Sequence, residues 1–468
     1  MHYHDTSFWV SDLTPDNNPA QRAELHSDLE VDIAIIGAGY TGLWSAYYLK
    51  QAKPELSIAI FEAREVGFGA SGRNGGWLMG SIEGQDELLE HLPLERRRRA
   101  LQQIYGLIDE TQRVCQKEGI DCDLHRGGWL NVAARYPEQL PRLQQSLKHL
   151  HHLGHRPEDY QWLDAAQVQE RLNIQNPYGG IFTPHTARIQ PAKLAAGLAK
   201  AVERLGVKIY SKTAVKSFKS GQLTTEKVTV NADIILPCTE GFGCEKPSQK
   251  RFVLPIQSLI IATEPLSDDL WQEIGLNNNE TFGDASRLST YGQRTADNRL
   301  VFGARGTYQF GGQPKARFDD AATTFDATER LLREALPMLA SADIPHRWGG
   351  TLGITRSGAP HALFDKATGI GYAGGYGGEG VGASNLMART LVDLVLQKDT
   401  ELASMPWAYR GTLKQHIKRW EPEPLRWLGY SGILKMLEYE EEVLNNPQSP
   451  RWKRRTVNRL ASAAIGLM

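Results

Sequence analysis

The chain has 468 residues, which is enough for about two or three domains that each enclose a hydrophobic core. Hydrophobic residues make up 41% of it and charged residues 23%, as in ordinary globular proteins, and a formal net charge of -1 gives no reason to expect a nucleic-acid partner. Its 4 cysteines include no C-x-x-C pair, so the sequence indicates neither a zinc site nor a disulfide framework.

Residues 1–30 are predicted to be an irregular lead-in, because they are polar and contain the turn-forming segment 14–19. They lack a basic segment followed by an apolar core, so we expect no signal peptide. No apolar run in the chain approaches the roughly 20 residues that a membrane-spanning helix needs. We therefore expect a cytoplasmic protein.

Residues 31–62 form the most informative stretch of the sequence. The nearly continuous apolar run 31–36 predicts a parallel strand that is buried on both faces. Residues 43–50 predict a helix, and 57–61 predict a second buried strand. This strand–helix–strand order is typical of a unit that binds a dinucleotide.

A G-x-G-x-x-G motif lies between the first strand and the helix of this unit, formed by Gly37, Gly39 and Gly42. Gly37 permits a tight turn, Gly39 lets a pyrophosphate approach the backbone, and Gly42 lets the helix pack closely on the strand. Glu62 follows the second strand, 20 residues beyond Gly42, where it could accept a hydrogen bond from a ribose hydroxyl. The alternative is a tight turn without a ligand, but the complete context favours a dinucleotide site at the positive end of the helix dipole.

A second glycine-rich segment, residues 67–77, follows soon after the second strand. Its glycines alternate with Ser, Arg and Asn, so it could bring several N–H donors and one cation to a phosphate or a flavin ring. The alternative is a flexible surface loop. We disfavour that alternative because flexible linkers rarely contain Arg, Asn and Trp.

Residues 88–118 predict a long helix with apolar side chains along one face, and four consecutive arginines, 96–99, lie near its start. Such a run could bind an anionic partner, but we favour a solvated helix face. A strand at 127–132 and a charged helix at 137–153 follow.

Four histidines lie close together near the end of this charged helix: His149, His151, His152 and His155. Their spacing could place imidazoles around one metal ion. Gly154 interrupts the helix, and no Asp or Cys joins the cluster at a suitable spacing. We therefore favour a solvated face and predict no metal site.

A second strand–helix–strand set follows, with a helix at 189–204 and strands at 206–210 and 232–236. It fits an extension of the first sheet. From about residue 253 the pattern changes to alternating strands, and the turn 296–298 predicts a hairpin. Antiparallel strands here indicate a second domain, in which residues 321–336 form a helix.

Glycine-rich loops return at 348–355 and 370–381, and a helix predicted at 383–396 follows the second of them. A strand, a glycine cluster and a helix start again place backbone amides and a helix dipole against an electron-rich ligand. One nicotinamide domain does not explain two such loops so far apart. They suit a long, two-ended cofactor such as FAD.

With these motifs the chain resembles the D-amino acid oxidase-like FAD-dependent amine oxidoreductases, and within them the bacterial γ-glutamylputrescine oxidoreductase group. The resemblance runs from about residue 31 to 396 and continues, less specifically, through 420–427. Gly37, Gly39, Gly42 and Glu62 match the family's AMP-end motif. Residues 70–76 resemble its loop beside the pyrophosphate and isoalloxazine, and residues 374–381 resemble its C-terminal flavin loop. Residues 213–215 are similar to the segment whose backbone meets the adenine. The chain departs from the family at 237–241, where relatives often have Ala-Thr-Gly.

The resemblance implies a Rossmann-type α/β domain that binds FAD and a second, α+β substrate domain built on an antiparallel sheet. It assigns 31–90, 181–245 and 346–420 to the FAD domain, 91–180 and 246–345 to the substrate domain, and 421–468 to a C-terminal helical tail. None of the cysteines lies near the C-terminal loop, where some relatives attach flavin, so we expect non-covalent FAD. The predicted cofactor-binding residues are Gly37, Gly39, Tyr40, Thr41, Gly42, Glu62, Ala63, Arg64, Gly69, Ala70, Ser71, Arg73, Asn74, Gly75, Gly76, Val215, Gly375, Gly377, Gly378, Gly380 and Val381.

The implied chemistry is hydride transfer from the carbon that bears an amine to flavin N5, which gives an imine that water hydrolyses. Trp77, Tyr376 and Arg73 are candidates for the surroundings of the flavin, although ordinary loop packing would also explain them. In the antiparallel domain an arginine fork would suit an anionic substrate tail. The candidates there are Tyr291, Arg294 and Arg305, each of which could instead be a solvated strand residue.

Two other functions stay open. The chain could be a dehydrogenase that passes electrons to a quinone or a carrier protein instead of oxygen, or a protein that binds FAD without catalysis. The basic residues among 451–459 and the apolar ones after them could form an amphipathic foot on anionic lipid, but we favour a frayed basic tail.

Overall fold

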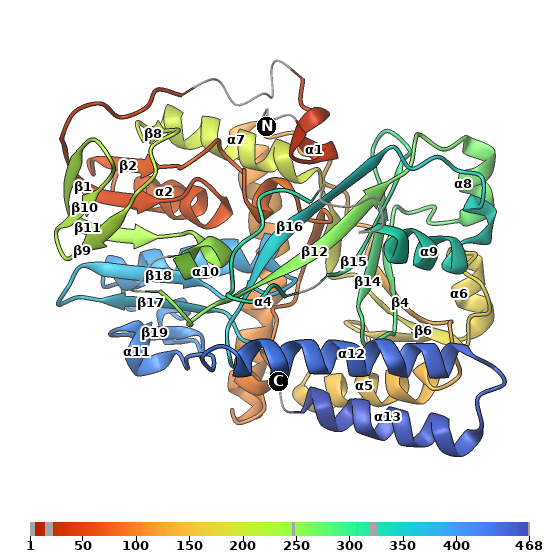
Figure 1. The fold of residues 1–468 in the computed structure, drawn as a ribbon. Helices are drawn as coiled ribbons and strands as arrows, with labels where there is room; N and C mark the ends of the chain where they lie inside the picture. The colour runs from red at the N-terminus through yellow and green to blue at the C-terminus, as the bar shows by residue number, and fades with distance from the viewer. Residues whose placement is uncertain (1–4, 15–21, 246–248, 307, 319–324, 467–468) are drawn as a thin grey trace. The chain divides into compact units, whose positions relative to one another are not determined.

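The computed structural model describes residues 5–14, 22–245, 249–306, 308–318 and 325–466, without the side chains of Cys244, Glu245 and Arg305 (Figure 1). The chain forms two compact units, each assembled from separate segments. Unit 1 comprises Met1–Leu124, Ile189–Pro255 and Gly350–Trp420. Unit 2 comprises His125–Arg188, Ile256–Gly349 and Glu421–Met468.

Unit 1 is built on a nine-stranded sheet with the order β19-β17-β18-β11-β1-β2-β8, to which the β9–β10 hairpin is added at β11. β1 pairs in parallel with β11 and β2, and β2 pairs in parallel with β8. The two predicted strand–helix–strand sets therefore share one sheet, as expected. The strands are β1 (Leu29–Ile36), β2 (Ile58–Phe61), β8 (Lys208–Tyr210), β9 (Ser217–Lys219), β10 (Gln222–Thr224), β11 (Thr229–Pro237), β17 (His361–Asp365), β18 (Ile370–Gly374) and β19 (Ala408–Arg410), and the short β3 (Trp77–Met79) lies outside this sheet.

The helices of unit 1 pack around α2, whose side chains are buried along almost its whole length. α10 and α7 both contact α2, and α4 packs on α10 (Figure 1). The predicted helix 88–118 is two helices, because the chain turns at Pro93 between α3 and α4. The helices are α1 (Phe8–Ser11), α2 (Tyr40–Ala52), α3 (Gln85–Leu89), α4 (Leu94–Glu118), α7 (Pro191–Arg204), α10 (Gly380–Val395) and α11 (Leu413–His416).

Unit 2 is built on an eight-stranded sheet with the order β16-β12-β15-β14-β13-β4-β6-β5. Its pairs are mostly antiparallel, as predicted, and the β14–β15 hairpin turns at Asn298, whose φ is +64°. β13 and β4 instead pair in parallel, which a local sequence pattern does not reveal. The strands of the sheet are β4 (Trp129–Ala133), β5 (Gln161–Leu163), β6 (Gly179–Thr183), β12 (Leu254–Ala262), β13 (Thr281–Asp284), β14 (Thr290–Arg294), β15 (Leu300–Arg305) and β16 (His346–Ile354), and the short β7 (Thr186–Arg188) lies outside this sheet.

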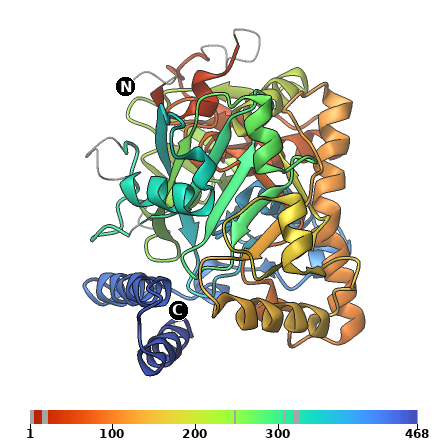
Figure 2. The ribbon, with the colours of Figure 1, turned by 90° about the vertical axis from the view of Figure 1, so that its right-hand side faces the viewer.

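The helices of unit 2 include a pair at the C-terminus, α12 and α13, that lie side by side (Figures 1 and 2). The expectation of a frayed tail is wrong. Glu440 of α12 is 0% exposed and bonds both Arg142 and Arg287, and Arg454 of α13 bonds Glu138 at 2.6 Å. The helices are α5 (Gln139–Leu153), α6 (Ala165–Arg171), α8 (Asp268–Ile274), α9 (Asp326–Ala335), α12 (Leu425–Asn445) and α13 (Arg451–Ile465).

The units divide the chain at other places than the predicted domains. α4, which the resemblance implied to be part of the substrate domain, belongs to unit 1, where it packs on α10. The C-terminal helices belong to unit 2. Among the described residues, no helix is both long and apolar enough to cross a membrane.

Candidate cofactor site

The turn between β1 and α2 requires glycine at two of the three motif positions. Gly37 has φ +103°, and a Cβ there would lie 2.7 Å from the backbone oxygen of Cys238 at the end of β11. A Cβ on Gly42 would lie 2.1 Å from the backbone oxygen of Gly37 and 3.2 Å from Ile35 of β1. The first turn of α2 therefore packs against the strand as closely as the motif predicts.

Gly39 has a different reason to be glycine. It is the N-cap residue of α2 and has an extended backbone, with φ -83° and ψ -177°, that any residue can adopt. A Cβ there would contact only the side chain of Ser71, at 3.0 Å from its Oγ. The Tyr40 N–H donates to the same Oγ at 2.9 Å, so a hydroxyl and the first amides of α2 meet at the helix N-terminus. Such a place favours an anion.

Glu62 follows β2, where the motif predicts an acceptor for a ribose. Its carboxylate accepts hydrogen bonds from the N–H groups of Ala38, at 2.9 Å, and Arg64, at 2.8 Å. These bonds fix its direction beside the glycine turn, although burial raises the pKa of this carboxyl. The Thr213 N–H donates to the Glu62 backbone oxygen, and Val215, two residues on, is buried. The predicted adenine segment thus lies against the end of β2.

The glycine-rich loop after β2 is held in place by its own side chains. Asn74 donates to the backbone oxygens of Ala70 and Ser71 and accepts from the Gly76 N–H at 2.8 Å. Arg73 is buried, donates to the Phe68 backbone oxygen, and has its guanidinium 4.6 Å from the centre of the Phe68 ring. These contacts within the loop fix its conformation, so it is not a flexible linker.

Residues near the N-terminus, which the sequence pattern predicts to be an irregular lead-in, support this loop. The Ser7 hydroxyl donates to the Gly72 backbone oxygen at 2.7 Å, and the Trp9 indole donates to that of Asn74 at 2.8 Å. Ser7 also caps α1, and Trp9 is 2% exposed. Residues 7–11 are thus an ordered part of unit 1. A Ser before three apolar residues was the only local signal.

The late glycine loop follows β18 and leads into α10. Gly375 and Gly377 have φ of +81° and +55°, in the region that favours glycine. The Gly377 N–H donates to the Gly353 backbone oxygen at 2.9 Å, and the Gly378 N–H donates to Glu83 at 3.2 Å. α10 begins at Gly380, and Val381 is buried in its first turn. The predicted glycine cluster before a helix start is therefore confirmed, although the N–H groups of Gly377 and Gly378 already have acceptors within the chain.

One hydrogen bond joins the late loop to the first motif. The Tyr376 hydroxyl and Thr41 Oγ1 lie 2.9 Å apart, although these residues are 335 positions apart in the sequence. Both side chains are buried. The start of α2 and the loop before α10 consequently belong to one site. Because the Tyr376 hydroxyl is bonded to Thr41, packing within the loop is enough to explain why a tyrosine occupies this position, without a contact to the flavin.

Two carboxyl groups at this site were not anticipated. Glu240 accepts hydrogen bonds from the N–H groups of Gly375 and Tyr376, and burial raises its pKa to about 7. Glu379 is the N-cap residue of α10, and burial together with the negative charge of Glu83 raises its pKa to about 8. The departure from the family pattern at 237–241 was the only available signal for Glu240.

The predicted substrate residues of unit 2 have partners of their own. The Tyr291 hydroxyl lies 2.5 Å from Ser258 Oγ. Arg294 donates to the side chain of Asn298 and stacks over Trp271 at 4.5 Å, so it closes the hairpin. Arg305 ends β15 opposite Ser258, but its side chain lies outside the described residues. Trp77, in unit 1, is half-buried in β3.

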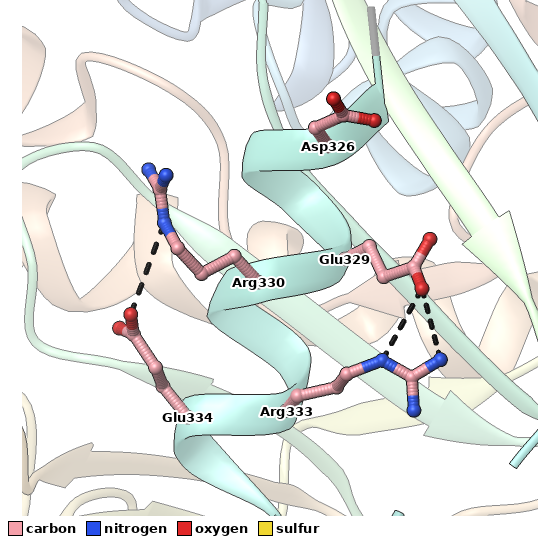
Figure 3. Close-up of a pocket in the computed structure, with 5 residues that line it drawn as sticks. All are labelled: Asp326, Glu329, Arg330, Arg333 and Glu334. Carbon is pink, nitrogen blue, oxygen red and sulfur yellow. Dashed lines mark hydrogen bonds and ion pairs between the residues drawn. The ribbon is translucent and has the colours of Figure 1, made fainter. Parts of the chain in front are cut away.

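A surface depression on α9 does not qualify as the site. Figure 3 shows that five charged residues of this one helix line it. Glu329 bonds Arg333 at 2.8 Å, and Arg330 lies 3.8 Å from Glu334 (Figure 3). These pairs largely neutralise one another at a solvent-exposed helix face.

Comparisons with known proteins agree on one family. The model of the protein family described as "FAD dependent oxidoreductase" (DAO) matches residues 32–394. The γ-glutamylputrescine oxidoreductase of Escherichia coli (strain K12) is 28% identical over 86% of this chain and 91% of its own length. The glycine oxidase of Geobacillus kaustophilus (strain HTA426) is 25% identical over 82% of this chain and 97% of its own length. The crystal structure of that glycine oxidase superposes with a TM-score of 0.67, at 22% identity, over 82% of this chain and 98% of that chain.

The residues of unit 1 fit FAD. The N-terminus of α2 offers amides, the Ser71 hydroxyl and an open position at Gly39 for the pyrophosphate. Glu62 is directed beside the same turn, as an acceptor for the ribose. The loop before α10 adds two positive-φ glycines, Gly375 and Gly377, where the absence of a Cβ lets the backbone approach a ring. A ligand that needs all three would be long and two-ended.

Proposed function

The chain belongs to the family of FAD-dependent oxidoreductases, and from this premise we propose that it oxidises a small amine or amino acid that carries an anionic tail. FAD is the cofactor, and amines or amino acids are the substrate class. The support for a tail comes from two relatives. The substrates after which these two enzymes are named, γ-glutamylputrescine and glycine, each combine an amine with a carboxylate.

The observation that carries the proposal is the bond between Tyr376 and Thr41, because it joins two distant glycine loops into one site. In our account the α2 N-terminus holds the pyrophosphate and Glu62 holds the ribose. The loop 374–381 meets the flavin. When bound, FAD supplies N5 as acceptor of a hydride from the carbon that bears the amine, and water hydrolyses the resulting imine.

We assign the substrate to the sheet of unit 2, with Arg305 as the leading candidate for the tail. It stands at the end of β15, and an Arg fork can grip a carboxylate bidentately. A fixed tail would determine which C–H bond faces the flavin. Tyr291, on the neighbouring strand β14, is a second candidate, and its bond to Ser258 would fix its hydroxyl. Trp77 is the candidate for contact near the ring.

The proposal is tested with pairs of amines that have the same length and differ only in a terminal carboxylate or carboxamide. We expect oxidation of the acidic member, with the aldehyde or ketone product and the free amine or ammonium formed in equal amounts. Oxidation of both members at equal kcat/KM would contradict the anionic tail. Fast reoxidation in air would identify oxygen as the acceptor, and slow reoxidation would identify a quinone or carrier.

A further inference from the structure

Glu240 occupies an unusual place in unit 1. It follows β11, and its φ of +44° lies in the left-handed region that residues with a side chain rarely adopt. A glycine at position 240 would adopt this conformation without strain, yet the chain has its glycine one position later, at Gly241. A strained backbone at a non-glycine residue persists when the surrounding structure requires that side chain. The contacts of the carboxylate show what requires it.

The carboxylate accepts hydrogen bonds from backbone N–H groups at or just after the ends of two other strands, β18 and β16. Its Oε1 accepts from the Tyr376 N–H at 3.1 Å, and its Oε2 accepts from the Gly375 N–H at 3.0 Å. The Gly353 amide, at the end of β16, also stabilises its ionised form. A Cβ on Gly353 would lie 2.6 Å from Oε1, and one on Gly374 would lie 2.5 Å from Oε2. Two glycines therefore make the space in which the carboxylate lies.

We infer that Glu240 is a positioning residue for FAD, which fastens the loop 374–381 to the ends of β11 and β16. The N–H groups of Gly375 and Tyr376, near the start of that loop, donate to Glu240. The Tyr376 hydroxyl in turn forms a hydrogen bond with Thr41 in the first turn of α2. A carboxylate suits this place because it only accepts hydrogen bonds, and charge-assisted bonds are stronger than neutral ones. The inference concerns the cofactor and holds whatever amine the protein oxidises.

The ionised form should hold the loop better than the protonated one, which has one acceptor oxygen fewer and an O–H that faces N–H groups. The titratable groups that interact with this carboxylate are the Cys238 thiol and the Tyr376 phenol, and the other neighbours in the site are His361, beside Gly375, and Glu379, at the end of the loop. Burial raises the pKa of Cys238 to about 12, raises that of Tyr376 well above its usual range, and lowers the pKa of His361 to about 4. Of these neighbours, only Glu379 can also titrate between pH 6 and pH 8.

The experiment measures the Kd of FAD for apo protein by quenching of FAD fluorescence, at pH 6 and pH 8. Glu240→Gln keeps one acceptor and the length of the side chain, and it should weaken binding at pH 8 about tenfold, as expected for one lost charge-assisted bond. Glu240→Ala should weaken it further. The matched control is Glu203→Gln, which removes a half-buried carboxylate bonded to Arg22 at 2.6 Å in the same unit.

The pH dependence separates positioning from mere loss of stability. Wild-type protein and Glu379→Gln should bind FAD several-fold more weakly at pH 6 than at pH 8, whereas Glu240→Gln should show no such change. The inference is overturned if Glu240→Gln binds FAD as tightly as wild type, if its pH dependence is unchanged, or if Glu203→Gln loses as much affinity. Failure of amine oxidation with FAD binding as described would count against the proposed function alone.

Discussion

Replacing Gly39 by Ala should separate cofactor binding from folding. The backbone there is extended, so alanine adopts it without strain, and its Cβ would contact only Ser71 Oγ, at 3.0 Å. Ser71 can turn its hydroxyl away. Alanine is a poorer N-cap residue than glycine, so we expect the free energy of unfolding of the apo protein to fall by about 1 kcal/mol or less.

The same methyl group should be far more costly for FAD. It would stand where the pyrophosphate approaches the α2 N-terminus and would push the phosphate away from those amides. Charge-assisted hydrogen bonds contribute about 1.5–3 kcal/mol each. The loss of one or two of them should weaken FAD binding roughly 10-fold to more than 100-fold. Gly39→Val, with a branched side chain, should abolish binding.

Gly42→Ala is the matched control because its Cβ would lie 2.1 Å from a backbone oxygen of the same turn. It should lower the thermal stability of the apo protein as well as FAD affinity. The assay combines thermal unfolding of apo protein with FAD titration for each variant. If Gly39→Ala retains stoichiometric FAD at wild-type affinity, the α2 N-terminus does not hold the pyrophosphate. A Gly39→Ala apo protein as unstable as Gly42→Ala would also refute the reasoning.

Three further outcomes are expected. Acid or heat should release all of the flavin as intact FAD. The reason is that Cys238, the described cysteine that follows β11, is buried and its raised pKa keeps it a thiol. Flavin that stays with the denatured chain would contradict non-covalent binding. Arg305→Ala should raise KM for carboxylate-bearing amines more than for neutral analogues of equal size, and an equal effect on both would exclude a role in tail binding. Glu440→Ala should lower the free energy of unfolding by about 1–3 kcal/mol, because it leaves the half-buried Arg142 and Arg287 without their shared carboxylate, whereas the exposed Glu442→Ala should change it little.

The sequence predicted the parts of the fold that depend on local pattern. The apolar runs 31–36 and 57–61 became β1 and β2 because strands buried on both faces need apolar side chains throughout. The helix start after Gln190 and the hairpin at Asn298 likewise follow from short-range signals, a Pro at the first turn and a residue that tolerates positive φ.

The features that the sequence did not predict depend on contacts between distant segments. Glu440 and Glu441 occur in a run of acidic residues that resembles a solvated helix face, yet both are buried and form ion pairs with arginines of α5 and of the loops that follow β4 and β13. Glu240 is an isolated acid in the sequence, and only the strand order brings it to Gly375 and Tyr376. Pairing of β4 with β13 is equally invisible in either strand alone.

The most direct test of the account is reduction of the bound flavin by substrate without oxygen. Holoenzyme is mixed anaerobically with an amine that carries a carboxylate, and with its neutral analogue, while the visible absorbance of the flavin is followed in a stopped-flow instrument. We predict that the acidic amine bleaches the flavin in a single turnover and that the neutral analogue bleaches it more slowly. If the flavin stays oxidised with every amine and amino acid of a broad panel, the chain binds FAD but does not oxidise amines.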